Sequence, residues 1–440
     1  MKVAFTTLGC RTNQHDTAEM QLLLEKEGFS IVNPLEAADI YVVNTCTVTA
    51  RSDYSSRLAV KKSLAINENA TVVFTGCYAQ LNPENAANLD GIDIVLGNAD
   101  KLKIAELLKK KLHNDEPQKK SGSAQIYMSN IHTKRLFHTL PVTQFQGRTK
   151  AFIKVQTGCD EKCSFCTVVR ARGSSISDLR ENVLNNIRQA IDQGYKEITL
   201  TGINLGTWGM DFASTETFSS LVRDIASLHG DFRVRLSSIN PMEIDDDLIE
   251  LITHHEKICP HLHIPLQSGD NEILSKMRRN YNVKQYERVV RYAAERIGPL
   301  GLGADVIVGF PGESEKSFEL TRKLIEELPF SYLHVFSYSP RAGTEAHSFR
   351  NNIKNITKKE RNRTLTNLAK EKAALFYKSF IGKEVTVLIE DRKHTEGIFK
   401  GHSEHYVPVR VDTESSLQNQ LVSVLIKEVN ENEVVGCLKL

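Results

Sequence analysis

The sequence lacks a long hydrophobic run, and this excludes a helical membrane protein. A transmembrane helix needs roughly 20 consecutive apolar residues, and no segment of the 440 residues approaches that length. The start, Met1-Lys2-Val3, leads straight into a strand-like segment without the apolar core of a signal peptide. We therefore expect no membrane span and a cytoplasmic location.

The sequence also has few cysteines and a small net charge. Eight cysteines in a chain of this length are too few for a disulfide scaffold. A net charge of +2 does not by itself indicate a nucleic-acid-binding protein. The sequence has no internal repeat and no long low-complexity segment. At about 150 residues per domain, the length predicts roughly three domains.

Three of the cysteines lie in one short loop. Cys159, Cys163 and Cys166 have the spacing C-x3-C-x2-C directly after the strand-like residues 151–155. Three thiolates can hold three irons of a [4Fe–4S] cube, which leaves the fourth iron open to a small molecule. The alternative is a structural zinc site, but zinc takes four ligands and no fourth ligand lies nearby in the sequence. The spacing therefore favours a cluster with an open iron.

Three further cysteines are distant in sequence but equivalent in position. Cys10, Cys46 and Cys77 each follow a short strand-like run, and helix-like stretches separate these runs. Strands that alternate with helices predict a parallel sheet, and ligands collect at the carboxyl edge of such sheets. Three buried core cysteines are the alternative, but the shared position favours a second cluster. Cys259 and Cys437 are expected to be ordinary packed residues.

Five segments are predicted along the chain. Six strand–helix repeats in the middle predict an open, partial (βα)6 barrel, and five short strands near the end predict a small antiparallel β-barrel. The fold class is therefore α/β with a small all-β domain. The predicted boundaries are 1–112 for a parallel α/β domain, 113–134 for a linker, 135–352 for the barrel, 353–378 for a basic helix and 379–440 for the β-barrel.

The predicted helix at 353–378 is rich in basic residues. Such a stripe is the footprint expected for contact with phosphates, and a solvated helix face is the alternative. The β-barrel after it is net acidic, so RNA contact there needs a local basic face or the helix itself. The basic residues of this region are Lys354, Lys358, Lys359, Arg361, Arg363, Lys370, Lys372 and Lys378.

Polar or glycine residues follow four of the predicted barrel strands, where barrel enzymes build their active sites. These runs are Thr201–Gly209, Arg233–Pro241, His263–Gly269 and Asp305–Glu313. Together with the cysteine loop and its Phe165, they resemble the methylthiotransferase family of radical S-adenosylmethionine (SAM) enzymes. The start Thr7–Gln14 is most similar to the branch that acts on N6-threonylcarbamoyladenosine (t6A) in tRNA.

The resemblance implies a role for each group of cysteines. The loop triad is the catalytic site and holds the [4Fe–4S] cluster that cleaves SAM. The other triad holds an auxiliary [4Fe–4S] cluster that carries sulfide or polysulfide. The C-terminal β-barrel corresponds to a TRAM domain, an RNA-binding module. The implied SAM contacts are Phe165, Gly202, Asn204, Arg235, Ser237, Ser238, Ile307 and Gly309.

The resemblance also implies the reaction. Two SAM molecules are used per turnover, and a methylthio group passes to C2 of t6A at position 37, next to the anticodon. The expected partners are the tRNA anticodon stem-loop, an electron donor such as flavodoxin or ferredoxin, and a sulfur donor, and the protein is expected to be a monomer. Two alternatives are a methylthiotransferase for an aspartate of a small-subunit ribosomal protein and a non-catalytic iron–sulfur RNA-binding protein.

An arginine is expected to read the threonyl carboxylate of t6A. A carboxylate in a dry pocket needs a partner, and arginine pairs with it through two hydrogen bonds. The candidates near the cysteines are Arg11, Arg51, Arg170 and Arg172, and the Arg170/Arg172 loop is preferred. This loop also departs from the family pattern, because serines follow Gly173 where further basic residues are usual.

Overall fold

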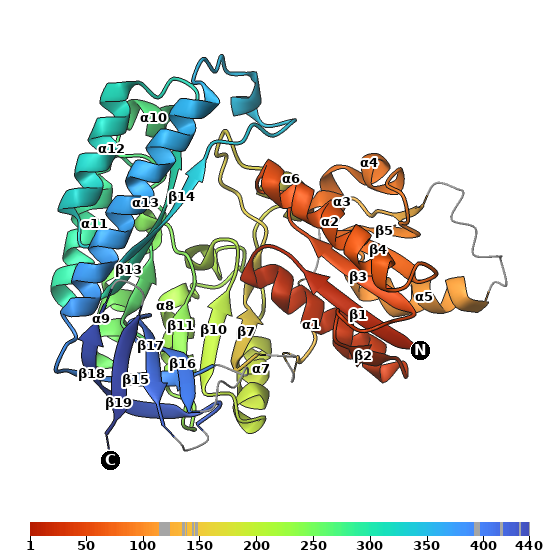
Figure 1. The fold of residues 1–440 in the computed structure, drawn as a ribbon, viewed down its shortest axis with the longest axis horizontal. Coiled ribbons are helices and arrows are strands. Elements are labelled where there is room, and N and C mark those ends of the chain that lie inside the picture. The colour runs from red at the N-terminus through yellow and green to blue at the C-terminus, as the bar shows by residue number, and fades with distance from the viewer. Residues whose placement is uncertain are drawn as a thin grey trace.

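The computed structural model describes residues 1–113, 124–133, 137, 139–142, 145, 148–390, 397–413, 417–430 and 433–439. They form a parallel α/β domain, a partial barrel and a small closed β-barrel (Figure 1). The predicted fold class is confirmed. Among the helices in these ranges, none has both the length and the apolar character needed to cross a membrane.

The N-terminal domain is a six-stranded parallel sheet with the order β2-β1-β3-β4-β5-β6. Strands β3 and β4 consist of buried residues only, because apolar clusters cover both faces of the sheet. The strands are β1 (Lys2–Thr7), β2 (Ser30–Val32), β3 (Ile40–Thr45), β4 (Thr71–Gly76), β5 (Ile94–Leu96) and β6 (Gln125–Tyr127). The α-helices are α1 (Arg11–Lys26), α2 (Ala50–Ile66), α3 (Cys77–Leu81), α4 (Pro83–Ala87) and α5 (Ile104–His113).

Strand β6 lies inside the segment predicted as a linker, 113–134. It pairs in parallel with β5, so this part of the segment belongs to the sheet. Two of its three residues are exposed, and a short edge strand of this kind gives little hydrophobic signal in the sequence. The rest of the predicted linker at 114–123 and 134 lies outside the described residues.

The partial barrel has six parallel strands in the order β7-β10-β11-β12-β13-β14. Isolated bridges between β11 and the β12 region join its two three-stranded halves. The strands are β7 (Lys150–Lys154), β10 (Glu197–Thr201), β11 (Arg233–Leu236), β12 (His261–His263), β13 (Gly301–Val308) and β14 (Tyr332–Ser337). A two-stranded ribbon, β8 (Gln156–Thr157) and β9 (Ile176–Ser177), follows β7. The barrel is open between β7 and β14, as the sequence predicts.

Amphipathic helices cover the outside of the barrel. Helix α9 is an example of how the local sequence forms these helices. Asp245 caps its first turn by accepting a hydrogen bond from Leu248 N, and Leu248, Ile249 and Ile252 form its buried face. These helices are α7 (Arg180–Asp192), α8 (Phe218–Ala226), α9 (Asp246–His254), α10 (Asn271–Lys276), α11 (Val283–Arg296), α12 (Glu315–Glu327) and α13 (Asn355–Lys378). The short helix α6 (Val168–Arg172) instead contacts α3 of the N-terminal domain. Helix α13 packs along α12 and β14, at one side of the opening (Figure 1).

The N-terminal domain packs against the other side of the opening through a buried set of charges. Asp16 on α1 accepts from Lys101 (2.8 Å), Lys154 on β7 (2.9 Å) and Arg172 on α6 (2.9 Å). Lys154 also donates to Glu19 at 2.6 Å. Burial alone raises the pKa of Asp16, but the three cations outweigh it and hold that pKa well below its usual range. The network therefore joins the two domains through ionised, fully paired groups.

The small C-terminal barrel closes in the order β15-β16-β17-β19-β18 around its own apolar core. Its strands are β15 (Glu384–Ile389), β16 (Ile398–Ser403), β17 (Pro408–Asp412), β18 (Leu421–Val429) and β19 (Val434–Leu438). It sits at the amino ends of the strands of the partial barrel (Figure 1), where Arg233 donates to the carbonyl oxygens of Thr386 and His402. The opposite, carboxyl ends remain available for chemistry.

A buried charge cluster holds this base together. Glu197 is fully buried and accepts from Arg235 (2.9 Å) and Arg233 (2.6 Å), while Lys150 Nζ lies 3.5 Å away. Arg235 also donates to the carbonyl oxygens of Ser403 and Glu404 in the small barrel. The SAM contact predicted for Arg235 does not fit this position, because its guanidinium is fully buried and already bonded on all sides.

Replacing Glu197 with glutamine is expected to destabilise the fold strongly. The change leaves two buried guanidinium groups without their carboxylate, and such a loss costs about 3–5 kcal/mol. Chemical denaturation followed by circular dichroism measures the effect. The exposed Glu181, in the first turn of α7, provides a control for which Glu181→Gln should shift the midpoint little. Equal midpoints for the two variants would contradict this role.

Candidate cluster and substrate site

The cysteine loop follows β7 at the carboxyl end of the barrel. Cys159, Cys163 and Cys166 are all partly buried, and the turn that joins the last two is closed by Cys166 N donating to Cys163 O at 3.1 Å. Burial raises the pKa of the Cys159 thiol to about 12 and that of Cys166 to about 11. Thiols of this kind release their protons only when a metal group binds.

The other three cysteines gather at the carboxyl edge of the N-terminal sheet. Cys10, Cys46 and Cys77 follow β1, β3 and β4, which are neighbours in the sheet. Gly9 has a φ of +93°, and a Cβ there would lie only 2.7 Å from Cβ of Cys46. Glycine therefore lets the Cys10 loop approach Cys46. Burial raises the pKa of Cys46, and the neighbouring Cys77 and Cys10 act in the same direction.

Neither triad is arranged for a single zinc ion. Two sulfurs on one zinc lie at most about 4.6 Å apart, because each Zn–S bond is about 2.3 Å. Within the described residues, no three cysteine sulfurs lie within 4.8 Å of one another. A [4Fe–4S] cube places each thiolate on a different iron. A cube therefore does not require the close approach of sulfurs that one zinc ion needs.

Arg279 is a site residue that the sequence did not reveal. Its Nη1 donates to Cys163 Sγ at 3.0 Å and its Nη2 to Asn240 Oδ1 at 2.6 Å. The guanidinium carbon of Arg279 also lies over the ring of Tyr281, 4.9 Å from the ring centroid. Arg279 is 116 positions from Cys163 in the chain, so only the fold brings the two together.

A cavity of about 1430 Å³ joins the N-terminal cysteines to the barrel interior. It is large enough for a nucleoside and a cofactor, since small-molecule sites usually measure about 300–1,000 Å³. Three domains supply its walls. They include Cys10 and Cys46, the strand-end residues Thr201, Gly202, Ser237 and Ser238, the aromatic residues His261, Tyr332 and Tyr406, and the α13 residues Lys358, Lys359, Arg363 and Lys370. We call this cavity the chamber.

The predicted SAM contacts are distributed over two regions. Gly202, Ser237 and Ser238 line the chamber. Asn204 lies next to Gly202, where its backbone N–H donates to Gln156 Oε1 at 3.0 Å. The remaining predicted contacts lie around an apolar cluster or beside α13: Phe165 and Ile307 pack on the cluster, and a Cβ at Gly309 would lie 2.5 Å from Cγ of Lys358.

The four candidate arginines separate into two pairs. Arg11 and Arg51 line the chamber, and Arg11 Nη1 lies 3.4 Å from Ser237 Oγ. Arg170 donates to Ala342 O outside the chamber, and Arg172 is buried in the domain interface. The preference for the Arg170/Arg172 loop is therefore not supported, because neither guanidinium faces the chamber.

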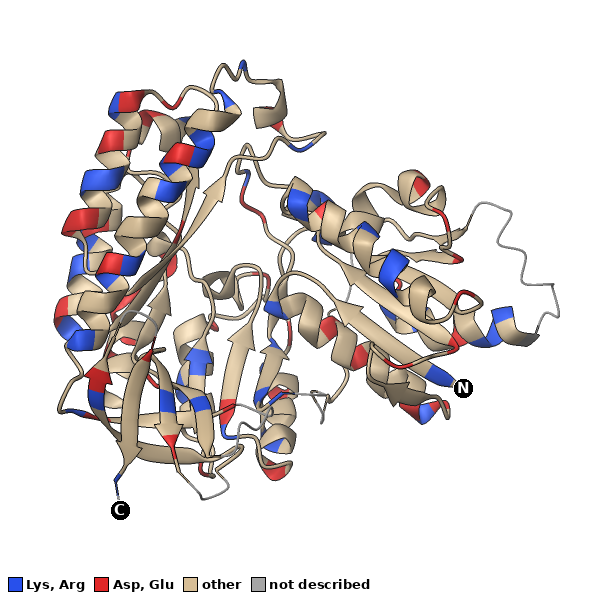
Figure 2. Cartoon of the chain, viewed as in Figure 1, with Lys and Arg blue, Asp and Glu red and all other residues tan. Residues whose placement is uncertain are grey.

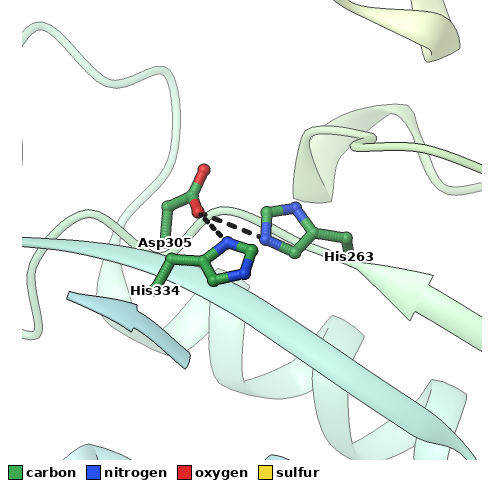
Figure 3. Close-up of side chains that lie close together, drawn as sticks. All are labelled: His263, Asp305 and His334. Atoms are coloured by element: carbon green, nitrogen blue, oxygen red, sulfur yellow. Dashed lines mark hydrogen bonds and ion pairs between the residues drawn. The ribbon is translucent and has the colours of Figure 1, made fainter. Parts of the chain in front are cut away.

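A polar wall lies on the barrel side of the chamber. His263 Nε2 and His334 Nδ1 point at the same Oδ1 atom of Asp305, at 3.3 and 3.1 Å (Figure 3). Ser238 Oγ lies 2.7 Å from Nδ1 of His263 and fixes that ring. Burial alone raises the pKa of Asp305, but the two histidines outweigh it and hold the pKa well below its usual range. One hydrogen bond joins His334 to Asp305 and another joins Ser238 to His263, whereas His263 Nε2 meets Asp305 only as an ion pair; we assign no metal ion to the three side chains.

Basic residues recur along α13 (Figure 2). Their side chains divide into an exposed and a buried face. Lys359, Arg363 and Lys370 are exposed at the rim of the chamber. Arg361 is buried and pairs with Glu313 at 2.6 Å, so it is structural. Lys358 is also buried, with its Nζ 5.4 Å from the centroid of the Tyr338 ring. The predicted basic stripe is therefore narrower than the sequence suggests.

Comparison with known proteins identifies the family. Residues 2–97 match the uncharacterized protein family UPF0004, and residues 153–325 match the radical SAM superfamily. The threonylcarbamoyladenosine tRNA methylthiotransferase MtaB of Aquifex aeolicus is 39% identical over 93% of this chain and 98% of its own length. The chain belongs to the radical SAM methylthiotransferases. MtaB of Bacillus subtilis is 35% identical over 96% of this chain and 93% of its own length.

A second group of relatives carries a different substrate in its name. The tRNA-2-methylthio-N(6)-dimethylallyladenosine synthase of Fusobacterium nucleatum is 32% identical over 97% of this chain and 97% of its own length. Among solved structures, the radical SAM methyltransferase TsrM of Kitasatospora setae covers 79% of this chain and 77% of its own, with a TM-score of 0.57 and 15% identity. This likeness shows a shared fold. Radical SAM methylthiotransferases use SAM and a [4Fe–4S] cluster.

Proposed function

We propose that this protein transfers a methylthio group to C2 of t6A at position 37 of tRNA. The observation that carries the proposal is the chamber, which joins the Cys10–Cys46 edge, the carboxyl ends of the barrel strands and a basic rim on α13. The relatives named for threonylcarbamoyladenosine have higher identity than those named for dimethylallyladenosine. The proposed RNA substrate, and the reduced thiolates that cluster binding requires, support action in the cytoplasm.

The two cysteine triads are proposed to hold two [4Fe–4S] clusters. Cys159, Cys163 and Cys166 hold the cluster that binds SAM, and the N-terminal triad holds the auxiliary cluster with its sulfide or polysulfide. When bound, these groups supply one-electron cleavage of one SAM and a sulfur that a second SAM methylates. A protein electron donor such as flavodoxin or ferredoxin and a sulfur donor complete the proposal, with the enzyme acting as a monomer.

The chain itself orients the reactants and excludes water. Phe165, Ile307 and Phe310 form an apolar wall beside the cysteine loop. Glycine at position 202 lets the end of β10 pack against Gln156, because a Cβ there would lie 2.9 Å from Gln156 Oε1. Tyr406 of the small barrel closes the chamber floor. The anticodon loop offers an unpaired base that can be turned into such an enclosed space.

Mass spectrometry of nucleosides tests the proposed function directly. Anaerobically reconstituted enzyme, SAM and a reductant should convert t6A in tRNA to its 2-methylthio derivative. Dimethylallylated tRNA and the small-subunit ribosomal protein serve as competing substrates. Methylthiolation of the aspartate in that protein, with t6A unchanged, would overturn the proposal in favour of the alternative branch. SAM cleavage with no product on any substrate would equally exclude a t6A enzyme.

Arg279 is expected to raise the reduction potential of the SAM-binding cluster. Its charge and its hydrogen bond to Cys163 favour the more negative, reduced state. Changing Arg279 to glutamine should lower the midpoint potential by roughly 50–100 mV, where 59 mV corresponds to a tenfold change for one electron. Redox titration followed by electron paramagnetic resonance measures this in a background without the N-terminal cysteines.

The adjacent Arg278 is the matched control. Its exposed guanidinium pairs with Glu345 at 2.7 Å and does not contact a cysteine. Arg278→Gln should leave the potential unchanged. If Arg278→Gln and Arg279→Gln shifted the potential equally, the hydrogen bond to Cys163 would not be the cause.

A further inference from the structure

Arg11 is the first residue of α1, directly after Cys10, and its side chain enters the chamber. Its one recorded hydrogen bond is the 3.4 Å contact with Ser237 Oγ. Among the described residues, no Asp or Glu oxygen lies within 4.0 Å of its guanidinium. A half-buried guanidinium with most of its five N–H donors unused can bind an anion through several hydrogen bonds.

Other enclosed arginines near the chamber already have a carboxylate. Arg341 pairs with Asp53 at 2.5 Å, Arg361 with Glu313 at 2.6 Å and Arg172 with Asp16 at 2.9 Å. Arg51 also lines the chamber but is exposed to solvent. Arg11 is therefore the enclosed arginine of this wall that has no protein carboxylate, within the part of the chain that the structure describes.

The polar wall of His263, Asp305 and His334 complements Arg11. A continuous path joins the two: Arg11 contacts Ser237, and the next residue, Ser238, contacts His263. Figure 3 shows both imidazole rings directed at the Asp305 carboxylate. The chamber thus has a cation on the N-terminal side and an anionic acceptor on the barrel side. A base with only an alkyl substituent matches neither of these groups.

We propose that Arg11 binds the α-carboxylate of an amino-acid substituent on the target base, with that substituent's hydroxyl and N–H donors facing the Asp305 wall. The inference deepens the proposed function, on which it rests, by naming the group that selects t6A. Because Arg11 adjoins Cys10, the bound carboxylate also fixes the base beside the N-terminal cysteines. The role is specificity and positioning.

The test uses two anticodon stem-loops. One carries t6A and the other its carboxamide analogue, which keeps the shape and removes the charge. Arg11→Met should lower kcat/KM on the t6A stem-loop by roughly 10–100-fold, the range for one charged hydrogen-bonded pair, and leave the carboxamide substrate unaffected. Arg11→Lys should recover part of the loss, because it restores the charge without the bidentate geometry.

Three further measurements distinguish a loss of substrate selectivity from a general loss of folding or cluster binding. Iron content and SAM cleavage without RNA should be the same in Arg11→Met and the parent. Arg188, exposed on α7, gives the control Arg188→Met, which should behave as the parent on both stem-loops. The dissociation constants of the two stem-loops should differ in the parent and become equal in Arg11→Met.

Equal losses on the t6A and carboxamide stem-loops would overturn the inference and assign Arg11 to a phosphate or to SAM. The binding measurement decides this even without turnover. An enzyme that binds the t6A stem-loop through Arg11 but methylthiolates neither substrate would instead contradict the proposed function. The two failures are therefore distinguishable.

Discussion

Anaerobically reconstituted protein is expected to hold about eight irons per chain, because each of two [4Fe–4S] clusters contributes four. Alanine at Cys159, Cys163 and Cys166 should leave about four irons and abolish SAM cleavage. Alanine at the N-terminal triad should also leave about four, preserve SAM cleavage and abolish methylthiolation. The reason is spatial: the loop triad follows β7 of the partial barrel, whereas the N-terminal triad follows β1, β3 and β4 of another sheet.

Iron analysis, Mössbauer spectroscopy and deoxyadenosine formation provide the measurements. Cys437 on β19 lies in the small barrel, away from both triads, so Cys437→Ala should keep about eight irons. Four irons in the intact protein would rule out two clusters. Loss of all iron in either triple variant would show that the two sites depend on each other.

Reversing three charges on α13 is expected to weaken tRNA binding on the order of 100-fold at low salt. Lys359, Arg363 and Lys370 lie on one exposed face at the chamber rim, and each lost phosphate contact costs about 1 kcal/mol. The slope of log affinity against log salt should fall by roughly 2–3, because about 0.7–0.9 is lost per phosphate. Filter binding over a salt series measures both.

The matched control reverses Lys284, Arg288 and Arg291. These three exposed residues have a similar helical spacing on α11, on the outside of the barrel. Their reversal should leave both affinity and salt slope close to the parent. Arg361 is omitted from the test because its pairing with Glu313 makes any change there a change in folding. Equal losses in the two triple variants would show that α13 contributes only general charge.

The sequence predicts this fold well because its signals are local. Strand-like runs that end in a cysteine or a glycine, and helices with a capped first turn, need only a few neighbouring residues to be recognised. The short edge strand β6 is not predicted from the sequence, because three residues with two exposed side chains form no periodic pattern. The common position of Cys10, Cys46 and Cys77 at one sheet edge was predictable for a related reason, since topology alone brings the ends of β1, β3 and β4 together.

The roles of single arginines depend on partners that are far away in the chain. The family resemblance implies a SAM contact for Arg235, yet its guanidinium is bonded to Glu197 and to the small barrel. The sequence favours the Arg170/Arg172 loop as the substrate contact, yet Asp16, 156 positions away in the chain, binds Arg172. Arg279 shows the converse, because nothing near it in sequence indicates Cys163. Charge and proximity to a motif do not reveal which carboxylate or thiol a guanidinium meets.

The ion pair between Asp16 and Arg172 has a consequence for the geometry of transfer. Asp16 follows Cys10 by six positions along α1, and Arg172 follows Cys166 by six positions. This ion pair therefore helps to fix the distance between the two cysteine loops, and under the proposed function that distance sets how cofactor and base meet. Misplacement by about 1 Å can cost 100-fold in rate. An enzyme in which this ion pair is weakened would keep its full iron content but transfer the methylthio group more slowly.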